Sequence, residues 1–298
     1  MKINLRKHTA GDRVFFTIIF ILLTLFFLAV LYPCVFVVSA SFSSGAAVNS
    51  GKVVFLPVNP TLEGYRTVFN TSSVWIGYRN SVFYTVVGTF FSIAMTMTTA
   101  YCLSRNDVPG RNFFMFFYTV TMFFSGGLIP TYLLIRNLGM LNTPWAIIIP
   151  GGVGVWNMIV AKTFIQHNIP SELLDAAKID GCGDVHYYIR IVLPLSKAII
   201  AVLILRFGVG FWNSYFSPMI YLHNRNLFPL TIYLREILMA TQIDPSTVMD
   251  PRLQMRLAEA AAIIKYALIV VTMVPVIMVY PFVQKYFVKG MMVGSIKG

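Results

Sequence analysis

The chain has 298 residues, of which 57% are hydrophobic and only 11% are charged, and its formal net charge is +12. Soluble globular domains carry about 25% charged residues, so this composition excludes an ordinary soluble enzyme, and the high hydrophobicity excludes a disordered chain. A nucleic-acid partner is not indicated, because the 23 Lys and Arg residues are scattered between apolar runs and form no basic stripe. We therefore expect an all-α protein that crosses a membrane several times.

Six apolar runs are long enough to cross a bilayer as helices, which takes about 20 residues each. They are the ranges 14–40, 81–103, 113–133, 144–164, 198–222 and 263–282. The first run is longer than the apolar stretch of about 7–15 residues in a secretory signal, which indicates a retained span. The third run is interrupted near its end by Gly126, Gly127 and Pro130. A glycine cluster that begins at Gly151 opens or kinks the fourth run.

Basic residues indicate how the six spans are oriented. Those in the two termini, in the connection after the second span and in the connection after the fourth all fall on one side of the membrane. They are Lys2, Arg6, Lys7, Arg13, Arg105, Arg111, Lys178, Arg190, Lys197, Lys285, Lys289 and Lys297. The positive-inside rule assigns that side to the cytoplasm. We expect a multi-pass protein of the plasma membrane with both termini in the cytoplasm.

Two long stretches are expected on the outer side. Residues 43–79 are rich in Gly, Ser, Asn and Pro, which predicts an irregular cap. Residues 223–257 contain the apolar stretch 228–240, which carries Arg235 and Glu236 and is expected to form a short interfacial helix instead of a seventh span. The chain shows no internal repeat.

The connection 165–197 is too polar to cross the membrane and too patterned to be a linker. Asn168 can cap a helix on whose one face Leu173, Leu174 and Ala177 fall at helical spacing. Gly181 is expected to end this helix in the left-handed conformation. Small residues next to this turn would let another backbone approach closely.

A second short helix is expected to start at Asp184 as its cap, to run toward Ile191 and to end before Pro194 and the fifth span. The result is a helical hairpin in the cytoplasm. Two interpretations remain open from the pattern alone. The hairpin can fit a groove on another protein, or it can lie as an amphipathic element on the bilayer surface.

The hairpin sequence ELLDAAKIDG, from Glu172 to Gly181, with the later Leu193-Pro194, resembles the EAA loop of ABC importer permeases. In this family the loop forms the coupling helices that dock into the ATPase subunits. Asp175 stands where many members have Glu, which keeps the charge. The resemblance assigns an ATPase-coupling role to Glu172, Asp175, Ala176, Ala177, Asp180, Gly181, Leu193 and Pro194.

Other segments resemble the sugar-transporting branch of the same family. The stretch 211–218 reads FWNSYFSP and resembles its WN motif, and the tail 287–298 and Asn80-Ser81 also match. The resemblance covers about residues 75–298 and is closest to the second, six-span permease of maltose-type carbohydrate importers. It implies an all-α membrane protein with six transmembrane helices, the type I ABC importer transmembrane domain.

The resemblance also implies a division of the chain. The expected parts are a cytoplasmic segment (1–13), the first span with its outer loop (14–74), the transmembrane core (75–288) with the coupling loop (165–197), and a cytoplasmic tail (289–298).

The function that the resemblance implies is ATP-driven import of a carbohydrate, in particular an oligosaccharide, by alternating access across the plasma membrane of a prokaryote. The chain would form half of a heterodimeric pore with a second, homologous permease. An ABC ATPase dimer would bind ATP and Mg²⁺, an extracytoplasmic sugar-binding protein would deliver the substrate, and lipid would surround the spans. This chain itself would hold no cofactor.

No motif indicates an enzyme. The sequence contains no GxxxxGK[ST] phosphate loop and no HExxH motif, and its four histidines are scattered. Its three cysteines form no CxxC pair, so they are expected to be packing residues. We therefore predict no catalytic residue, no metal site and no nucleic-acid partner.

A few polar and aromatic residues within the spans are candidates for the substrate pathway. An aromatic face against a sugar ring and amides against its hydroxyls would suit Trp212, Asn213, Tyr215, Asn157 and Arg206. The alternative for Asn213 is hydrogen bonding between helices, and for Arg206 it is a side chain that extends to the inner membrane boundary.

Two other classes of membrane protein fit the sequence less well than an ABC permease. An ion-coupled secondary transporter often has internal repeats and acidic residues at the bilayer midplane, whereas the eleven Asp and Glu residues here lie outside the spans. A membrane-embedded enzyme would need a nucleophile or metal constellation, which the sequence lacks.

Overall fold

The computed structural model describes residues 9–240 and 251–295, and every regular element in these ranges is helical. The chain forms two compact units. One comprises Met1–Asn70 and Ile237–Val271, and the other comprises Thr71–Glu236 and Thr272–Gly298. The long helix α15 (Pro251–Ser295) contributes to both units.

The first unit begins with α1 (Ala10–Ser41), a helix whose most apolar stretch has a mean hydropathy of 3.1 and no buried residue. Thr9 caps it, since its hydroxyl accepts from the Asp12 amide while the Asp12 carboxylate accepts from the Thr9 amide at 3.0 Å. The helices α2 (Gly45–Asn49) and α3 (Glu63–Asn70) follow. A small core of Ala40, Ala47 and Val53 packs with Tyr266 of α15.

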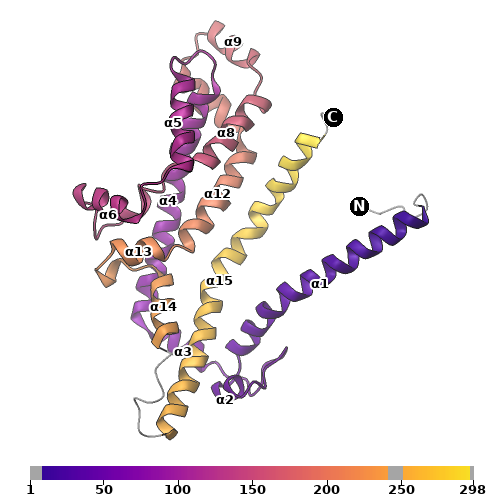
Figure 1. Cartoon of the computed structure of the whole chain (residues 1–298), viewed down its shortest axis with the longest axis vertical. Helices are drawn as coiled ribbons and strands as arrows, with labels where there is room; N and C mark the ends of the chain where they lie inside the picture. The colour runs from indigo at the N-terminus through magenta and orange to yellow at the C-terminus, as the bar shows by residue number, and fades with distance from the viewer. Residues whose placement is uncertain (1–8, 241–250, 296–298) are drawn as a thin grey trace. The chain divides into compact units, whose positions relative to one another are not determined.

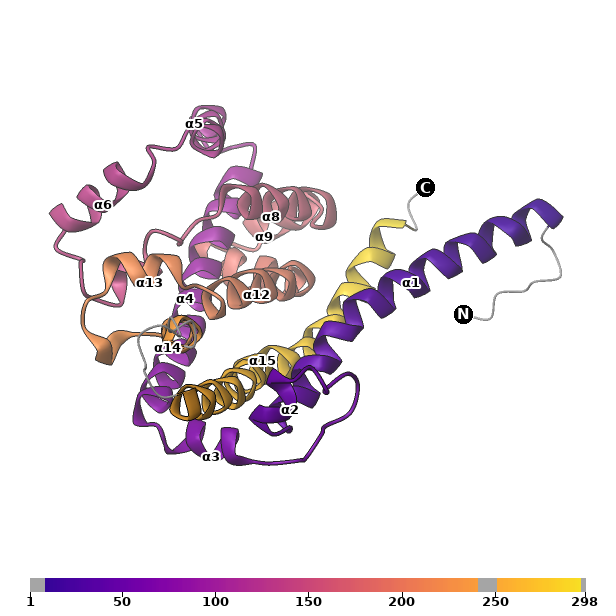
Figure 2. The same ribbon diagram turned by 60° about the horizontal axis from the view of Figure 1, so that its bottom comes forward.

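The second unit is built around α4 (Ser72–Ser104), which packs against α12 (Lys197–Trp212) and α8 (Val155–Asn168). Figures 1 and 2 show these three helices side by side. Their core is formed by fully buried apolar residues, among them Met97, Met158 and Leu203.

Shorter elements complete the second unit. They are α5 (Arg111–Phe123), α6 (Leu128–Asn137), α7 (Trp145–Ile148), α9 (Glu172–Ile179), α10 (Asp184–Tyr187), the π-helix η2 (Tyr188–Val192), α11 (Leu193–Leu195), α13 (Phe216–Tyr221), the 3₁₀ helix η3 (Arg225–Leu227) and α14 (Leu230–Ala240). Figure 1 shows α9 beyond the ends of α5 and α8, at the opposite end of α4 from α14.

The predicted spans are recovered to different degrees. Three helical segments are long and apolar enough to cross a membrane: Gly11–Ser41, Ser72–Ser104 and Ala258–Val279. Two further pairs qualify only as bent units, Arg111–Phe123 with Leu128–Asn137 at 119° and Asp184–Leu195 with Lys197–Trp212 at 80°. The predicted break in the third span is thus confirmed, and Gly127 at φ +83° lies at the bend.

The predicted fourth span, 144–164, is not among these segments. It is divided between α7 and α8, and α8 has 14 residues, fewer than the roughly 20 that a perpendicular span requires. Glycines at 151, 152 and 154 separate the two helices, as the sequence indicated. At Gly152 a Cβ atom would lie 2.7 Å from the Phe91 ring, so this backbone lies directly against α4.

The outer stretches agree with the sequence only in part. Residues 43–79 are not irregular throughout, because α2 and α3 lie within them and α4 begins at Ser72, nine residues before the predicted second span. The predicted helix 228–240 is confirmed as α14.

Parts of the predicted termini lie outside the described residues. This applies to Lys2, Arg6, Lys7 and Lys297, to residues 1–8 of the predicted cytoplasmic segment and to residues 296–298 of the predicted tail.

Candidate functional site: the hairpin between α8 and α12

The connection between α8 and α12 is a helical hairpin of residues 172–195, formed by α9, α10, η2 and α11. Its turn is closed by Gly181, which has φ +73°. The Gly181 amide donates to the Lys178 carbonyl at 3.1 Å, and the Cys182 amide donates to the Ala177 carbonyl at 2.8 Å. These two bonds make a Schellman motif, so the predicted left-handed glycine cap is confirmed.

The two sides of α9 differ as the pattern predicted, with one exception. Ala177 is 7% exposed and packs with Leu174 against the core of the second unit, whereas Glu172, Asp175 and Lys178 are exposed. Leu173 is the exception at 40% exposure. The methyl group of Ala177 therefore packs within the chain. Ala176 and Gly181 are small residues that remain exposed on the hairpin.

Neither predicted capping residue acts as a cap. The Asn168 amide donates to the Phe164 carbonyl at 2.9 Å inside α8, and α9 begins after Ser171. Gly183 precedes α10, and the Asp184 carboxylate instead accepts from Arg105. The sequence suggested caps because Asn and Asp favour such positions. Instead, Asn168 belongs to the end of α8 and bonds to its backbone, and Asp184 binds the guanidinium of the distant Arg105.

The second limb joins the fifth span through an irregular turn. A π-helix from Tyr188 to Val192 is followed by α11 and by an 80° bend at Ser196. Pro194 lies in α11, which directly continues the π-helix, and it has no amide to donate to the preceding turn. Short π-helical segments are rare and frequently occur at functional positions.

The free surface of the hairpin is partly apolar. Ile179 is 86% exposed, Val185 is 72% exposed and Ile189 is 55% exposed. Ile179 lies between the exposed small residues Ala176 and Gly181 in the sequence. Apolar side chains flanked by small residues and by the acidic Glu172 and Asp175 form a surface suited to contact with another protein.

Ion pairs fasten the hairpin to the loop after α4. The Arg105 guanidinium binds both oxygens of Asp107, at 2.8 Å and 2.5 Å, and also binds the Asp184 carboxylate. Lys178 donates to Asp107 at 3.2 Å. Arg105 is only 10% exposed although its partners are largely exposed. Hydrogen bonds from Arg105, followed by those from Lys178, hold the pKa of Asp107 well below its usual value.

Aromatic stacking continues this attachment along α4. The Tyr101 hydroxyl accepts from Arg105 at 2.9 Å, and the guanidinium lies 5.7 Å from the Tyr101 ring centroid. The Tyr101 ring stacks on Tyr188 with centroids 5.0 Å apart. The Tyr188 hydroxyl lies 3.3 Å from the Thr98 hydroxyl. One side of the hairpin is thus packed along the last two turns of α4.

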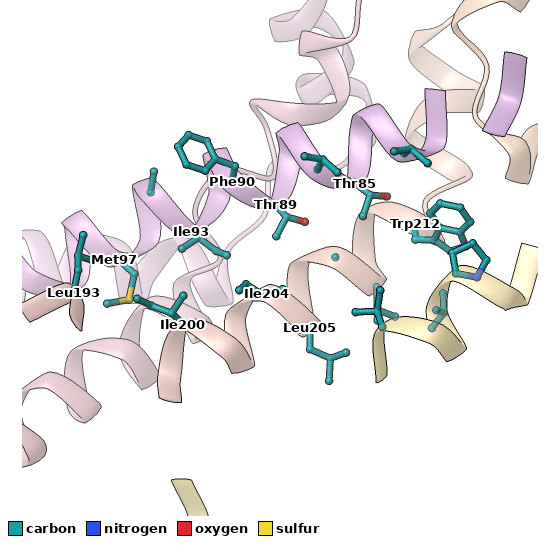
Figure 3. Close-up of a pocket in the computed structure, with 18 of the residues that line it drawn as sticks. Thr85, Thr89, Phe90, Ile93, Met97, Leu193, Ile200, Ile204, Leu205 and Trp212 are labelled. Atoms are coloured by element: carbon teal, nitrogen blue, oxygen red, sulfur yellow. The ribbon is translucent and has the colours of Figure 1, made fainter. Parts of the chain in front are cut away.

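A predominantly apolar groove of about 770 Å³ runs along α4 and α12 and is completed by Pro275, Val276 and Val279 of α15. Figure 3 shows Trp212 at one end of the groove and Met97 and Leu193 at the other. The hairpin itself contributes Tyr188 and Leu193 to the lining. The hydroxyls of Thr85 and Thr89 are buried and have no hydrogen-bond partner among the described residues.

The structure separates the candidate pathway residues. Trp212 is 5% exposed, and its indole Nε1 already donates to the Thr272 carbonyl at 3.0 Å. Asn213 and Tyr215 are exposed, and the Tyr215 ring lies 5.7 Å from the Arg235 guanidinium carbon. Arg206 is exposed on α12, and Asn157 is partly buried near the start of α8. Of the five, only Trp212 lines the groove.

The Asn80-Ser81 pair holds the segment before α14. The Asn80 amide donates to the carbonyls of Asn226 and Phe228 at 2.7 and 3.0 Å. The Ser81 hydroxyl accepts from the first amide of α14, that of Leu230, at 2.9 Å. These polar side chains in an apolar helix satisfy the backbone of a loop that follows about 145 residues later.

Sequence reasoning treated Arg105 only as an orienting charge and did not mention Asp107. An arginine two residues before an aspartate in a short loop could have indicated the Arg105–Asp107 pair. The bond from Arg105 to Asp184 joins residues 79 positions apart, and only the folded structure reveals it. Within the described residues no group of His, Cys, Asp and Glu side chains is placed to hold a metal ion.

Comparison with known proteins identifies the class of protein that this fold and hairpin represent. The family of binding-protein-dependent transport system inner membrane components matches residues 69–293. The chain belongs to this family. The resemblance drawn from the hairpin and from the stretch 211–218 is thereby confirmed.

Relatives match the chain over nearly its whole length. It is 39% identical to the polygalacturonan/rhamnogalacturonan transport system permease protein YtcP of Bacillus subtilis (strain 168), over 96% of this chain and 99% of that protein. It is 38% identical to protein LplC of the same strain, over 89% of each chain. The arabinooligosaccharides transport system permease protein AraQ of Halalkalibacterium halodurans is 28% identical over 91% of this chain and 92% of that protein.

A solved structure has the same fold. A chain from the crystal structure of a bacterial ABC transporter involved in the import of the acidic polysaccharide alginate matches with a TM-score of 0.85 and 33% identity, over 94% of this chain and 99% of that chain. The predictions of an all-α membrane fold and of a permease subunit of an ABC importer are confirmed.

Proposed function

We propose that this chain is one of two permeases in an importer that takes up a carbohydrate, specifically an oligosaccharide, at the expense of ATP. The relatives support this substrate class, because three of those that match are named for polygalacturonan/rhamnogalacturonan, arabinooligosaccharides and galactooligosaccharides. The solved structure with the same fold belongs to a transporter of an acidic polysaccharide.

The hairpin is the proposed contact with a separate ATPase dimer. ATP and Mg²⁺ bind to that dimer and not to this chain. The observation that carries this proposal is the exposed surface around Ala176, Ile179 and Gly181, which is rigid through the Schellman turn and is attached to α4 by Arg105. Glu172, Asp175 and Asp180 give this surface an acidic rim. Leu193 and Pro194 set the direction in which the hairpin joins α12.

The proposed pathway contacts are Asn213 and Tyr215, which are exposed after the end of α12. Trp212 is assigned a positioning role, since its indole N–H is already bonded. Arg206 is proposed to face the pore or the second permease, because a charge within the bilayer needs protein or water around it. Asn157 is proposed to offer its amide to the substrate pathway.

The proposed assembly contains this chain, a second homologous permease, the ATPase dimer and an extracytoplasmic sugar-binding protein. Both termini and the hairpin lie on the cytoplasmic side, and the first span with its outer loop precedes the transmembrane core. In this arrangement ATP binding closes the ATPase dimer, moves the hairpin and turns the cavity outward, and hydrolysis resets it.

The test uses two glycines in the same conformation. Gly181 on the hairpin and Gly139 after α6 both have positive φ, 73° and 67°, and a Cβ on either meets nothing within 4 Å in the chain. Gly181→Asp and Gly139→Asp therefore carry similar backbone strain, about 1–2 kcal/mol, but only the first adds charge and bulk to the proposed docking surface.

We expect Gly181→Asp to lower the amount of ATPase that purifies with the membrane-inserted chain and to lower uptake of oligosaccharides from a polygalacturonan digest. Gly139→Asp should leave both unchanged. Equal behaviour of the two variants, or uptake by liposomes that contain no ATPase, would contradict the proposed function.

A further inference from the structure

The hairpin is connected to α8 and α12 by the chain itself, but its attachment to α4 depends on side chains. At the α4 end, Arg105, Tyr101 and Thr98 contact Asp184 and Tyr188. They lie beside an apolar core that α4 residues share with Ala177 and Tyr187 of the hairpin. Two limbs of the hairpin meet in this cluster, because Lys178 of α9 binds Asp107 and Asp184 of α10 binds Arg105.

We propose that Arg105 is a positioning residue that makes the hairpin and α4 move as one body, so that motion imposed on the hairpin reaches the groove between α4 and α12. This inference rests on the proposed function of the hairpin. It goes beyond that function because it assigns the transmission of motion to a residue outside the hairpin.

The geometry of Arg105 suits this role. Its planar guanidinium has five donors, and here they reach Asp107 in two places, Asp184 and the Tyr101 hydroxyl. A two-point bond to a carboxylate fixes orientation as well as distance. A lysine has three donors on a single nitrogen, so it cannot form the planar two-point bond to Asp107 that fixes orientation.

Arg105 is shielded from water, whereas its two carboxylate partners are exposed. The Arg105 side chain is 10% exposed, and Tyr101, at 7% exposed, covers it from the side of α4. Exposed ion pairs contribute little because water screens them, and the Asp107 and Asp184 side chains are 45% and 65% exposed. The proposed role of Arg105 therefore depends on the several bonds that it makes at once and not on the strength of a single pair. The neighbouring Arg111 differs, since its bonds go to the Asn106 side chain and the Arg105 carbonyl.

A continuous set of contacts leads from this cluster to the groove. Arg105 bonds to Tyr101, Tyr101 stacks on Tyr188, and Tyr188 lines the groove together with Met97 and Thr98 of α4. Figure 3 shows Met97 and Leu193 at this end of the groove. Without Arg105, the hairpin could follow the ATPase while α4 and its groove residues lag behind.

The experiment measures coupling in the assembled importer, purified through a tag on this chain and reconstituted in liposomes. ATP hydrolysis and uptake of oligosaccharides from a polygalacturonan digest are measured together. The variants are Arg105→Gln, Arg105→Lys and Asp184→Asn, with Arg111→Gln as the matched control. Asp184 is 65% exposed, so Asp184→Asn keeps the inference testable if Arg105→Gln does not fold.

We expect Arg105→Gln and Asp184→Asn to bind the ATPase and hydrolyse ATP while the sugar transported per ATP falls about fivefold or more. Arg105→Lys should restore part of the ratio, and amide hydrogens of residues 172–188 should exchange faster in the two uncoupled variants. Arg111→Gln should match the unmodified importer.

An unchanged transport ratio in Arg105→Gln or in Asp184→Asn would overturn the inference, as would an equal loss in Arg111→Gln. Failure of the proposed function is distinguishable, because then Gly181→Asp would not weaken the association with the ATPase.

Discussion

The indole Nε1 of Trp212 donates a hydrogen bond to the backbone carbonyl of Thr272 at 3.0 Å, which ties the end of α12 to α15. The Trp212 ring also meets Tyr78 of α4 edge-on, with ring centroids 5.7 Å apart. Trp212 therefore joins three helices of the second unit at one end of the groove.

Trp212→Phe should keep the ring contact but lose the interhelical hydrogen bond. We expect the free energy of unfolding in detergent to fall by about 0.5–2 kcal/mol, with little change in the KM of uptake, because the indole N–H is already bonded to the Thr272 carbonyl. A much weaker apparent affinity for sugar without loss of stability would show instead that Trp212 contacts the substrate.

Gly77 marks a close approach between α4 and α14. A Cβ atom there would lie 2.7 Å from the Tyr233 ring and 3.0 Å from the Leu230 Cα. Gly77→Ala should therefore lower stability by about 1–3 kcal/mol, measured as thermal unfolding in detergent. Gly210→Ala is the control, since a Cβ on Gly210 meets nothing within 4 Å and alanine favours the helix. Equal melting temperatures for the two variants would disprove the close approach.

Asn80 supports the segment before α14 with two donated hydrogen bonds. Asn80→Asp should remove both hydrogen bonds, because an ionised carboxylate cannot donate to the carbonyls of Asn226 and Phe228. The carboxylate and the two carbonyl oxygens should instead repel one another. We expect a loss of about 1–3 kcal/mol in stability and faster amide exchange around Leu230. The exposed Asn112 provides the matched control in Asn112→Asp, which should leave exchange at Leu230 unaltered.

The Asp107 carboxyl should give the hairpin attachment a defined dependence on pH. Arg105, and then Lys178, lower the pKa of Asp107 in the folded chain below the value of about 3.9 expected when unfolded. The ionised form thus stabilises the fold above about pH 4, and this contribution is lost as the pH falls through the lower folded value.

The measurement is the difference in melting temperature between the unmodified chain and Asp107→Asn. This difference should be constant between about pH 7 and pH 5 and should shrink below about pH 4. In an Arg105→Gln background it should be small throughout, because the main cause of the lowered pKa is gone. A difference that grows toward acidic pH would contradict the assignment.

The sequence predicted features that depend on local pattern. The left-handed turn at Gly181, the break of the third span near Gly127 and the helix at α14 all follow from residue type and periodicity. The motifs of the hairpin and of the stretch 211–218 were sufficient to indicate the family.

Features that depend on distant contacts could not be predicted. Asp184 suits a helix cap by its type, but Arg105, 79 residues earlier, binds it instead. Ala177 looked available to a partner, yet the core of its own unit buries it. The break before α8 had a local signal in the glycine cluster from Gly151, whereas the 80° bend at Ser196 was not predicted.

The central claim is that the hairpin meets a separate ATPase on the cytoplasmic side, and cysteine labelling at its tip tests it most directly. Ile179→Cys is introduced after Cys34, Cys102 and Cys182 are replaced by alanine, because Ile179 is 86% exposed. A membrane-impermeant maleimide should label it in inside-out vesicles stripped of the ATPase, and bound ATPase should protect it. Labelling in right-side-out vesicles, or labelling that the bound ATPase does not reduce, would contradict the account.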